Sequence, residues 1–122
     1  MSRSVLLQLA RDSIEEVLQA QITIDRTSLL NEHPLLNETL DVTLNLFINQ
    51  ELKGSHSTQN SETSLLSNII LSAKKAAFED KKNSVFTTSD YLNCEVEIVL
   101  DTPDGEISQK DPSIIHTQTV TS

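Results

Sequence analysis

The sequence predicts a single domain of the α+β class, with an antiparallel sheet packed by two main helices. Residues 4–20 and 64–80 repeat apolar side chains at helical spacing. Residues 41–48 and 94–100 alternate apolar and polar side chains, which is typical of half-buried strands. A chain of 122 residues can bury about two-thirds of its unfolded surface, so we expect one core and one domain over residues 1–122.

The first helix is predicted over residues 4–20, where one face is apolar and the other is polar. At about 100° per residue, the apolar side chains gather on one side: Leu6, Leu9, Ala10, Ile14, Val17 and Leu18. The other side carries Gln8, Arg11, Asp12, Glu15, Glu16 and Gln19. A membrane-surface helix would carry Lys and Arg on its polar face, whereas this face is acidic, so we expect the apolar stripe to pack on the core.

A β-hairpin is predicted over residues 41–54. Its first strand, residues 41–48, points four aliphatic side chains to one face: Val42, Leu44, Leu46 and Ile48. Asn49 and Gln50 follow as a two-residue turn, because Asn tolerates the left-handed conformation that a tight hairpin needs. Gly54, one of two glycines in the chain, indicates a bulge or a close approach of another backbone.

The remaining segments carry weaker patterns. We expect residues 22–24 to form at most a short strand, residues 26–40 an ordered connection, and residues 55–63 a polar loop. After the strand at residues 94–100 comes a Thr-Pro-Asp-Gly turn. Residues 106–122 then either add an edge strand or extend as a loose tail.

The composition argues against several kinds of partner and site. Eighteen acidic and nine basic residues give a formal charge of −9, which repels a phosphate backbone, so we expect no nucleic-acid partner. No run of about 18 apolar residues is present to cross a membrane. Cys94 is the only cysteine, which indicates a reducing, cytoplasmic location. The three histidines show no metal-ligand spacing, and no cofactor is indicated.

Three stretches of the chain carry a family pattern. Residues 51–54 read Glu-Leu-Lys-Gly, residues 76–80 read Ala-Ala-Phe-Glu-Asp, and residues 95–98 read Glu-Val-Glu-Ile. With these motifs the chain resembles the AMMECR-type domain family over most of residues 4–104. Members of that family have a strand-turn-strand unit ending in Glu-Leu-Arg-Gly-Cys-Ile-Gly, then a helix ending in Ala-Ala-Phe-Glu-Asp and a strand with a Glu-Ile-Glu-Val core. The resemblance implies an antiparallel sheet packed by helices; the family has no established reaction.

The chain departs from the family pattern in both motif regions. Residues 53–57 read Lys-Gly-Ser-His-Ser where the family has Arg-Gly-Cys-Ile-Gly, so the arginine, the thiol and the second glycine are replaced. The family's Pro-Arg-Phe-Pro-Pro-Leu-Thr loop corresponds to residues 81–87, where Lys82 keeps the basic character. Family members also continue for about another half-domain. We therefore expect a shortened, divergent member.

The candidate binding residues fall in these two regions: Lys53, Ser55, His56, Glu79, Asp80 and Lys82. Ser55 and His56 are of the residue types that form a nucleophile and a base, but neighbours on a strand point to opposite faces. The carboxylates of Glu79 and Asp80 are of a type that binds a cation or transfers a proton. The alternative is a structural role at the end of the helix. No catalytic residue and no metal ligand is assigned.

The leading prediction is a non-catalytic interaction or regulatory module, with a protein partner or a second copy of the chain. The alternative is an enzyme or a small-molecule binder, whose cleft would lie between residues 53–57 and 78–82, with Lys53 and Lys82 holding an anion. We also expect a homodimer, because a shortened domain leaves a sheet edge or an apolar helix face uncovered.

Overall fold

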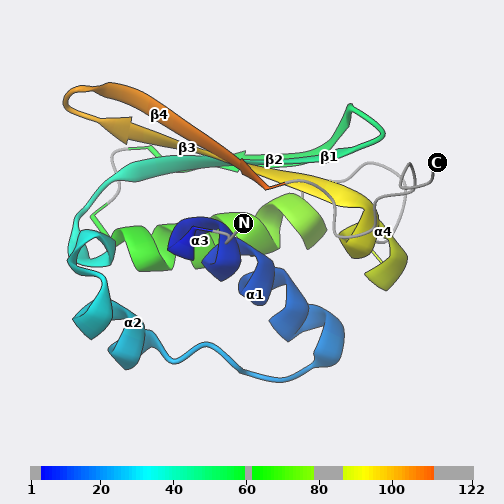
Figure 1. Ribbon diagram of the computed structural model, residues 1–122, viewed down its shortest axis with the longest axis horizontal. Coiled ribbons are helices and arrows are strands. Elements are labelled where there is room, and N and C mark those ends of the chain that lie inside the picture. Colours follow the sequence, from blue (N-terminus) through cyan, green and yellow to red (C-terminus); the bar gives the residue numbers. More distant parts are fainter. Residues whose placement is uncertain (1–3, 60–61, 79–86, 112–122) are drawn as a thin grey trace.

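A four-stranded antiparallel sheet lies over a layer of helices in the computed structural model, which describes residues 4–59, 62–78 and 87–111 (Figure 1). The elements follow in the order α1 (Val5–Gln19), α2 (Arg26–Glu32), the 3₁₀ helix η1 (Pro34–Asn37), β1 (Asp41–Ile48), β2 (Glu51–Ser57), α3 (Leu65–Phe78), α4 (Thr88–Asn93), β3 (Cys94–Thr102) and β4 (Gly105–Asp111). This architecture confirms the predicted α+β class. Within these described ranges, no helix is long and apolar enough to span a membrane.

The strands are arranged in the order β2-β1-β3-β4, and every neighbouring pair is antiparallel. Asn49 and Gln50 both have positive φ, so the predicted two-residue turn between β1 and β2 is confirmed. A second tight turn joins β3 to β4. β1 and β3 therefore form the centre of the sheet, and β2 and β4 are its two edges.

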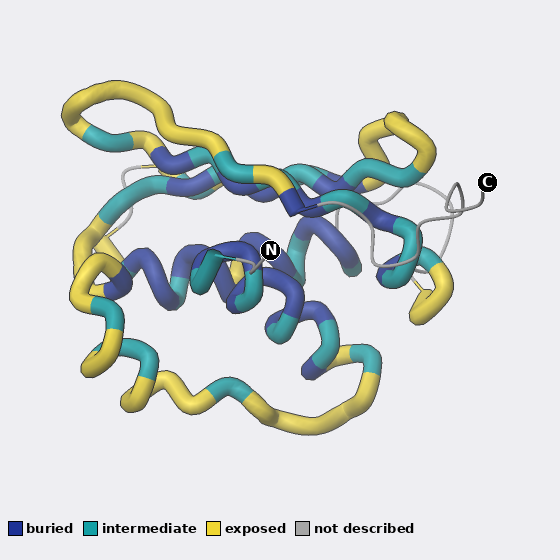
Figure 2. Tube along the Cα trace, viewed as in Figure 1, coloured by how far each residue is buried: buried dark blue, intermediate teal, exposed yellow. Residues whose placement is uncertain are grey.

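The core lies between the sheet and the two long helices. α1 and α3 pack against one face of the sheet, and the buried positions of the central strands alternate as predicted (Figures 1 and 2). The aliphatic side chains that these strands bury are Val42, Leu44, Leu46, Val96, Ile98 and Leu100. Their opposite neighbours form an outer face, over which no helix lies in the described part of the chain.

Residues 22–24, which were expected to form at most a short strand, form none, and Ile22 is 90% exposed. Two of the weaker predictions were wrong. The predicted connection at residues 26–40 contains α2 and η1; α2 begins where the Asp25 side chain accepts a hydrogen bond from the Ser28 backbone N–H. β2 continues to Ser57, so the first three residues of the predicted polar loop belong to the sheet.

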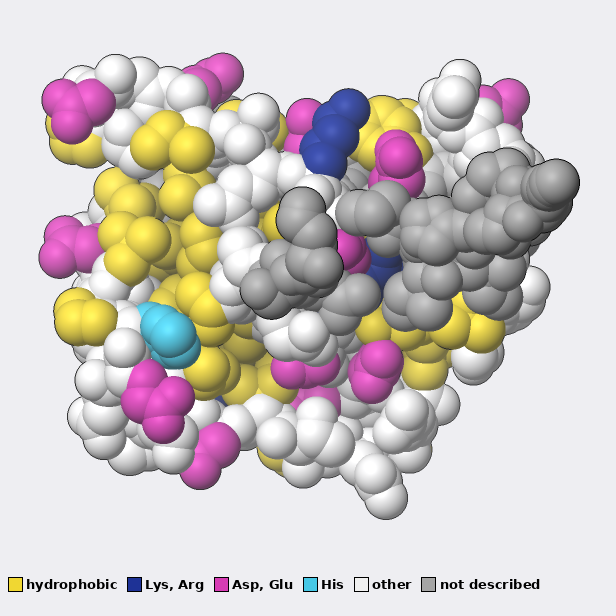
Figure 3. Space-filling view, viewed as in Figure 1, with side chains coloured by type: hydrophobic (Ala, Val, Ile, Leu, Met, Phe, Trp, Pro, Cys, Tyr) yellow, Lys and Arg dark blue, Asp and Glu magenta, His cyan; other side chains and the backbone are white. Residues whose placement is uncertain are grey.

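The short helix α2 buries no residue completely. Figure 3 shows hydrophobic side chains gathered at the surface on the side of the molecule where α2 and η1 lie. Leu29 and Leu30 are half-buried there, and Leu35 of η1 is 46% exposed. The apolar side chains of α2 and η1 are therefore less buried than those between the long helices and the sheet.

Candidate functional site

The predicted motif at residues 53–57 lies on the edge strand β2. The ammonium group of Lys53 is 3.4 Å from a carboxylate oxygen of Glu51, and both side chains are exposed. Ser55 donates a hydrogen bond to Asn45 Oδ1 on the outer face (2.7 Å). His56 points to the helical side, where its Nδ1 is 3.1 Å from Ser72 Oγ of α3. Since they point to opposite faces, Ser55 and His56 do not form a nucleophile and base pair.

The backbone of β2 rests directly on α3 at Gly54. A Cβ atom placed on Gly54 would lie 1.9 Å from the backbone oxygen of Ala76, which only glycine avoids. The pairing of β1 with β2 also shifts register between Leu46 and Phe47, opposite this segment. Both readings of Gly54, a bulge and a close backbone approach, are therefore confirmed.

This close packing bears on the cleft predicted between residues 53–57 and 78–82. Gly54 meets Ala76 of α3, two residues before the second segment begins, so no space for a ligand exists between β2 and α3 at that point. The other predicted site residues, Glu79, Asp80 and Lys82, lie outside the described residues. Their part in a binding site stays a prediction.

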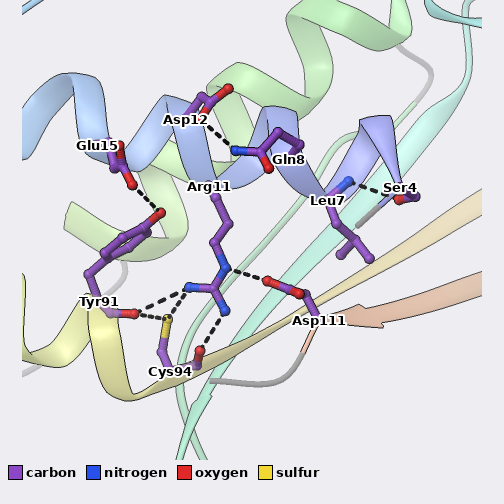
Figure 4. Close-up of polar contacts among 9 residues, drawn as sticks. All are labelled: Ser4, Leu7, Gln8, Arg11, Asp12, Glu15, Tyr91, Cys94 and Asp111. Carbon is purple, nitrogen blue, oxygen red and sulfur yellow. Dashed lines mark hydrogen bonds and ion pairs between the residues drawn. The ribbon is translucent and has the colours of Figure 1, made fainter. Parts of the chain in front are cut away.

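A buried arginine joins α1 to the start of β3 and the end of β4 (Figure 4). Arg11 is fully buried, and its Nε donates to the carboxylate of Asp111. Its two terminal nitrogens donate to the backbone oxygens of Tyr91 (3.2 Å) and Cys94 (2.9 Å). Burial by itself lowers the pKa of Arg11, but the hydrogen bond to Asp111 and nearby polar groups outweigh it, so the pKa is raised and Arg11 stays charged.

The other side chains of this cluster are held in unreactive forms. Burial raises the pKa of the Cys94 thiol, although Arg11 opposes that shift, so Cys94 remains a thiol at neutral pH. Burial, followed by a hydrogen bond to Glu15, raises the pKa of the Tyr91 hydroxyl. The cluster therefore holds four elements together, α1, α4, β3 and β4, and offers no nucleophile or general base.

A second buried charge ties the end of α1 to α3. Glu16 accepts hydrogen bonds from the backbone N–H groups of Thr23 and Ile24 (2.8 Å each) and from Lys74 Nζ (3.0 Å). Burial alone would raise the pKa of Glu16, but these bonds lower it. The helical pattern placed Arg11 and Glu16 on a solvated face, and this prediction was wrong, because α1 packs against both α3 and the sheet.

Three carboxylates lie side by side on the outer face of the sheet. Asp101 of β3 is directly opposite both Asp41 of β1 and Glu106 of β4, so the three form one row across the strands. A hollow of about 350 Å³ opens beside them, and the hydroxyl-bearing residues Thr43 and Thr58 also line it. Like charges directly opposite on neighbouring strands repel each other. Sequence reasoning missed this row, because only the strand register brings its members together.

The neighbouring positions on the outer face carry balanced charges. Lys110 of β4 is directly opposite Glu97 of β3, and Glu97 accepts a hydrogen bond from Asn45 Nδ2 (3.0 Å). The Lys110 ammonium also lies 5.9 Å from the centre of the Phe47 ring. Among the residues that the structure describes, no three His, Cys, Asp or Glu side chains are placed so that together they could hold a metal ion.

The family model that matches this sequence is AMMECR1, over residues 7–119. The chain belongs to the AMMECR1 family. This result confirms the family predicted from the motifs. A comparison with curated proteins found no similar sequence.

A solved structure also shares the fold. It is the crystal structure of an uncharacterised protein from Pyrococcus horikoshii, with a TM-score of 0.68 and 25% sequence identity. The match covers 80% of this chain and 50% of that one, so the present chain spans about half the length of that AMMECR1-type relative.

Proposed function

We propose that this chain is a non-catalytic interaction module of the AMMECR1 family, and that it acts in the cytoplasm by pairing with a second copy of itself. The observation that carries the proposal is the one-sided covering of the sheet. Helices occupy one face and seat the β2 edge, while the outer face and the β4 edge carry no helix in the described ranges. Open sheet surfaces of this kind are used for protein contacts.

The chemistry of the described residues supports a non-catalytic role. The charged side chains with strong local partners, Arg11 and Glu16, hold secondary-structure elements together. His56 contacts Ser72 inside the packed layer, where it helps to seat β2. Cys94 is buried as a protonated thiol, which suits the reducing environment of the cytoplasm.

The proposal is tested by measuring the mass of the intact chain in solution. Sedimentation equilibrium over a dilution series should give a reversible monomer–dimer equilibrium. A monomer at every concentration up to the millimolar range would overturn it.

A phosphate titration followed by NMR tests the alternative of an anion site. Under our proposal, the amide signals of residues 53–57 do not move at phosphate concentrations that would saturate a specific site. Saturable shifts there, lost in the Lys53→Gln variant, would favour the binder over the interaction module.

A further inference from the structure

The edge strand β4 is built as a regular template for another strand. Its pairing with β3 continues without a register shift from Thr102↔Gly105 to Val96↔Asp111. Most of its residues are exposed, and near its end Gln109 and Asp111 accept hydrogen bonds from Ser4 and Arg11 on the helical side. On its helical side, Ile107 remains 51% exposed. A long, unbulged edge with an exposed aliphatic side chain favours pairing with a further strand.

The charges on β4 are arranged with opposite signs at its two ends. Glu106 extends the acidic row formed by Asp41 and Asp101, where it is repelled. Lys110 lies four residues later on the same outer face, next to Glu97. A strand that brought a positive charge beside Glu106 and a negative charge beside Lys110 would complement both ends.

We propose that the occupant of this edge is β4 of a second copy of the chain, paired antiparallel about a twofold axis at Ser108. This inference rests on the proposed function and identifies the surface that performs it. In this register Glu106 is directly opposite the partner's Lys110, and Lys110 is directly opposite the partner's Glu106. The two sheets join into one continuous antiparallel sheet, and the same surface serves both copies, as a closed dimer requires.

Charge complementarity selects this register over its neighbour. Residues that are directly opposite share a face of the sheet, so the partner of each residue can change only in steps of two. Each such step moves the twofold axis by one residue. An axis at Ile107 would place Glu106 opposite Ser108 of the other copy and Lys110 opposite the turn residue Asp104. Only the axis at Ser108 matches opposite charges at both ends of the contact.

This register also brings apolar side chains together on the helical side of the joined strands. Ile107 lies directly opposite the partner's Gln109 and diagonally across from the partner's Ile107, within reach of both side chains. It packs next to Leu100, which is already buried, so pairing extends the core past its present limit. Burial of this exposed aliphatic side chain adds an apolar contribution to the contact.

The other edge is unsuited to the same pairing. β2 contains the register shift opposite Gly54, and its backbone rests on α3 at that residue. A bulge and a covering helix are features that oppose strand addition. β2 therefore supplies matched controls within the same molecule.

The first test exchanges the charges at the two ends of β4. Glu106→Lys and Lys110→Glu should each raise the dimer dissociation constant about tenfold or more, because each places like charges opposite one another twice. The double variant, Glu106→Lys with Lys110→Glu, should restore it to near the original value. Rescue cannot arise within one chain, because positions 106 and 110 are about 13 Å apart along the strand.

The controls carry the same reversals on β2. Glu51→Lys and Lys53→Glu should leave the dissociation constant unchanged, and thermal unfolding should show that every variant is folded. If the single reversals on β4 have no effect, or the double variant is as weak as either single one, the proposed register is wrong.

The second test uses a cysteine at the axis. Ser108→Cys should form a disulfide-linked dimer under mild oxidation, because the two copies of this position face each other at a distance that a disulfide spans. Ser57→Cys on β2 should not, and the natural Cys94 is buried.

The outcomes separate this inference from the proposed function. A stable dimer would overturn pairing through β4 if Ser108→Cys forms no disulfide and the charge reversals leave the dissociation constant unchanged. Self-association itself would still stand. A crosslink at Ser57 alone would assign the contact to β2. A dimer weakened by changes at Leu35 and not by changes on β4 would assign it to the apolar side chains around α2 and η1. A monomer throughout would overturn both proposals.

Discussion

The two edge strands of the sheet are held by the helices in different ways. β2 is seated on α3, where Gly54 meets the backbone of Ala76 and His56 meets Ser72. β4 is fastened at its last residues, where Gln109 accepts a hydrogen bond from Ser4 and Asp111 accepts one from Arg11. The first half of β4 therefore extends beyond the helices that hold its end (Figure 1).

In the part of the chain that the structure describes, the sheet therefore has one edge held against a helix along its length and one edge held only near its end. β2 combines a close contact with α3 and a register shift, which together oppose strand addition. β4 keeps a regular register and a half-exposed aliphatic side chain. An edge fastened at one end only remains a template for another strand.

The largest effect is expected from removing the anchor of β4. In Arg11→Met, the Asp111 carboxylate and the backbone oxygens of Tyr91 and Cys94 each lose the hydrogen bond that Arg11 donates in a buried site. The free energy of unfolding should fall by about 3–5 kcal/mol in urea denaturation. Arg26→Met on the exposed surface of α2 is the control and should change it by less than about 0.5 kcal/mol. A small loss at Arg11 would show that the end of β4 is held by other contacts.

The next largest effect is expected at the contact between β2 and α3. Gly54→Ala forces α3 away from the strand, because the new methyl group overlaps the Ala76 oxygen. We expect a loss of about 3 kcal/mol in the same assay. Lys53→Ala, one residue away and exposed, should cost less than about 0.5 kcal/mol. Equal losses at both positions would contradict the backbone contact.

A third variant removes a contact that belongs to neither edge. Glu16→Gln should lower the free energy of unfolding by about 1–2 kcal/mol at neutral pH, because a charged acceptor is lost. The folded-state pKa of Glu16 is below its ordinary value of 4.5, so its contribution is present above that pH and is lost as the pH falls through the folded-state pKa. The difference from the parent should therefore shrink in acid. Self-association at neutral pH should not change.

Urea denaturation at several pH values checks this pattern. Glu32→Gln, on the exposed end of α2, is the control and should change the free energy of unfolding at neutral pH by less than about 0.5 kcal/mol. A gap between parent and Glu16→Gln that persists unchanged far below pH 4.5 would show that the contribution is not electrostatic.

The smallest effect on stability is expected at the free half of β4. Ile107 and Leu52 are exposed to similar extents, 51% and 56%, on opposite edges. Ile107→Thr and Leu52→Thr should each change the free energy of unfolding by less than about 0.5 kcal/mol. Only Ile107→Thr should weaken the dimer in sedimentation equilibrium. An equal loss of association from Leu52→Thr would remove the distinction between the two edges.

Local patterns were enough to predict much of the fold. The hairpin turn at Asn49 and the close approach at Gly54 follow from the conformations that these residue types allow. The burial of Arg11 could not be read from its helix, because its partner Asp111 is 100 residues away in the chain. The helical pattern counts a charged residue as solvated, whereas burial depends on what packs against it.

The predicted site shows the same difference between what local patterns predict and what long-range contacts decide. The motif at residues 53–57 was placed correctly on a strand only as far as Gly54, since the polar residues that follow read as a loop. The acidic row of Asp41, Asp101 and Glu106 draws one residue from each of three strands, so register alone creates it.

Periodicity, turn chemistry and family motifs, all of them local in the chain, were sufficient to assign the α+β class, the central strands and membership of the AMMECR1 family. Which edge is closed and which is open was decided by tertiary contacts: Gly54 on Ala76 at one edge, and Arg11 with Asp111 at the end of the other. The physical reason is that a pattern reports which face of an element is apolar, whereas the anchors of an edge are single long-range contacts between residues whose types predict no partner.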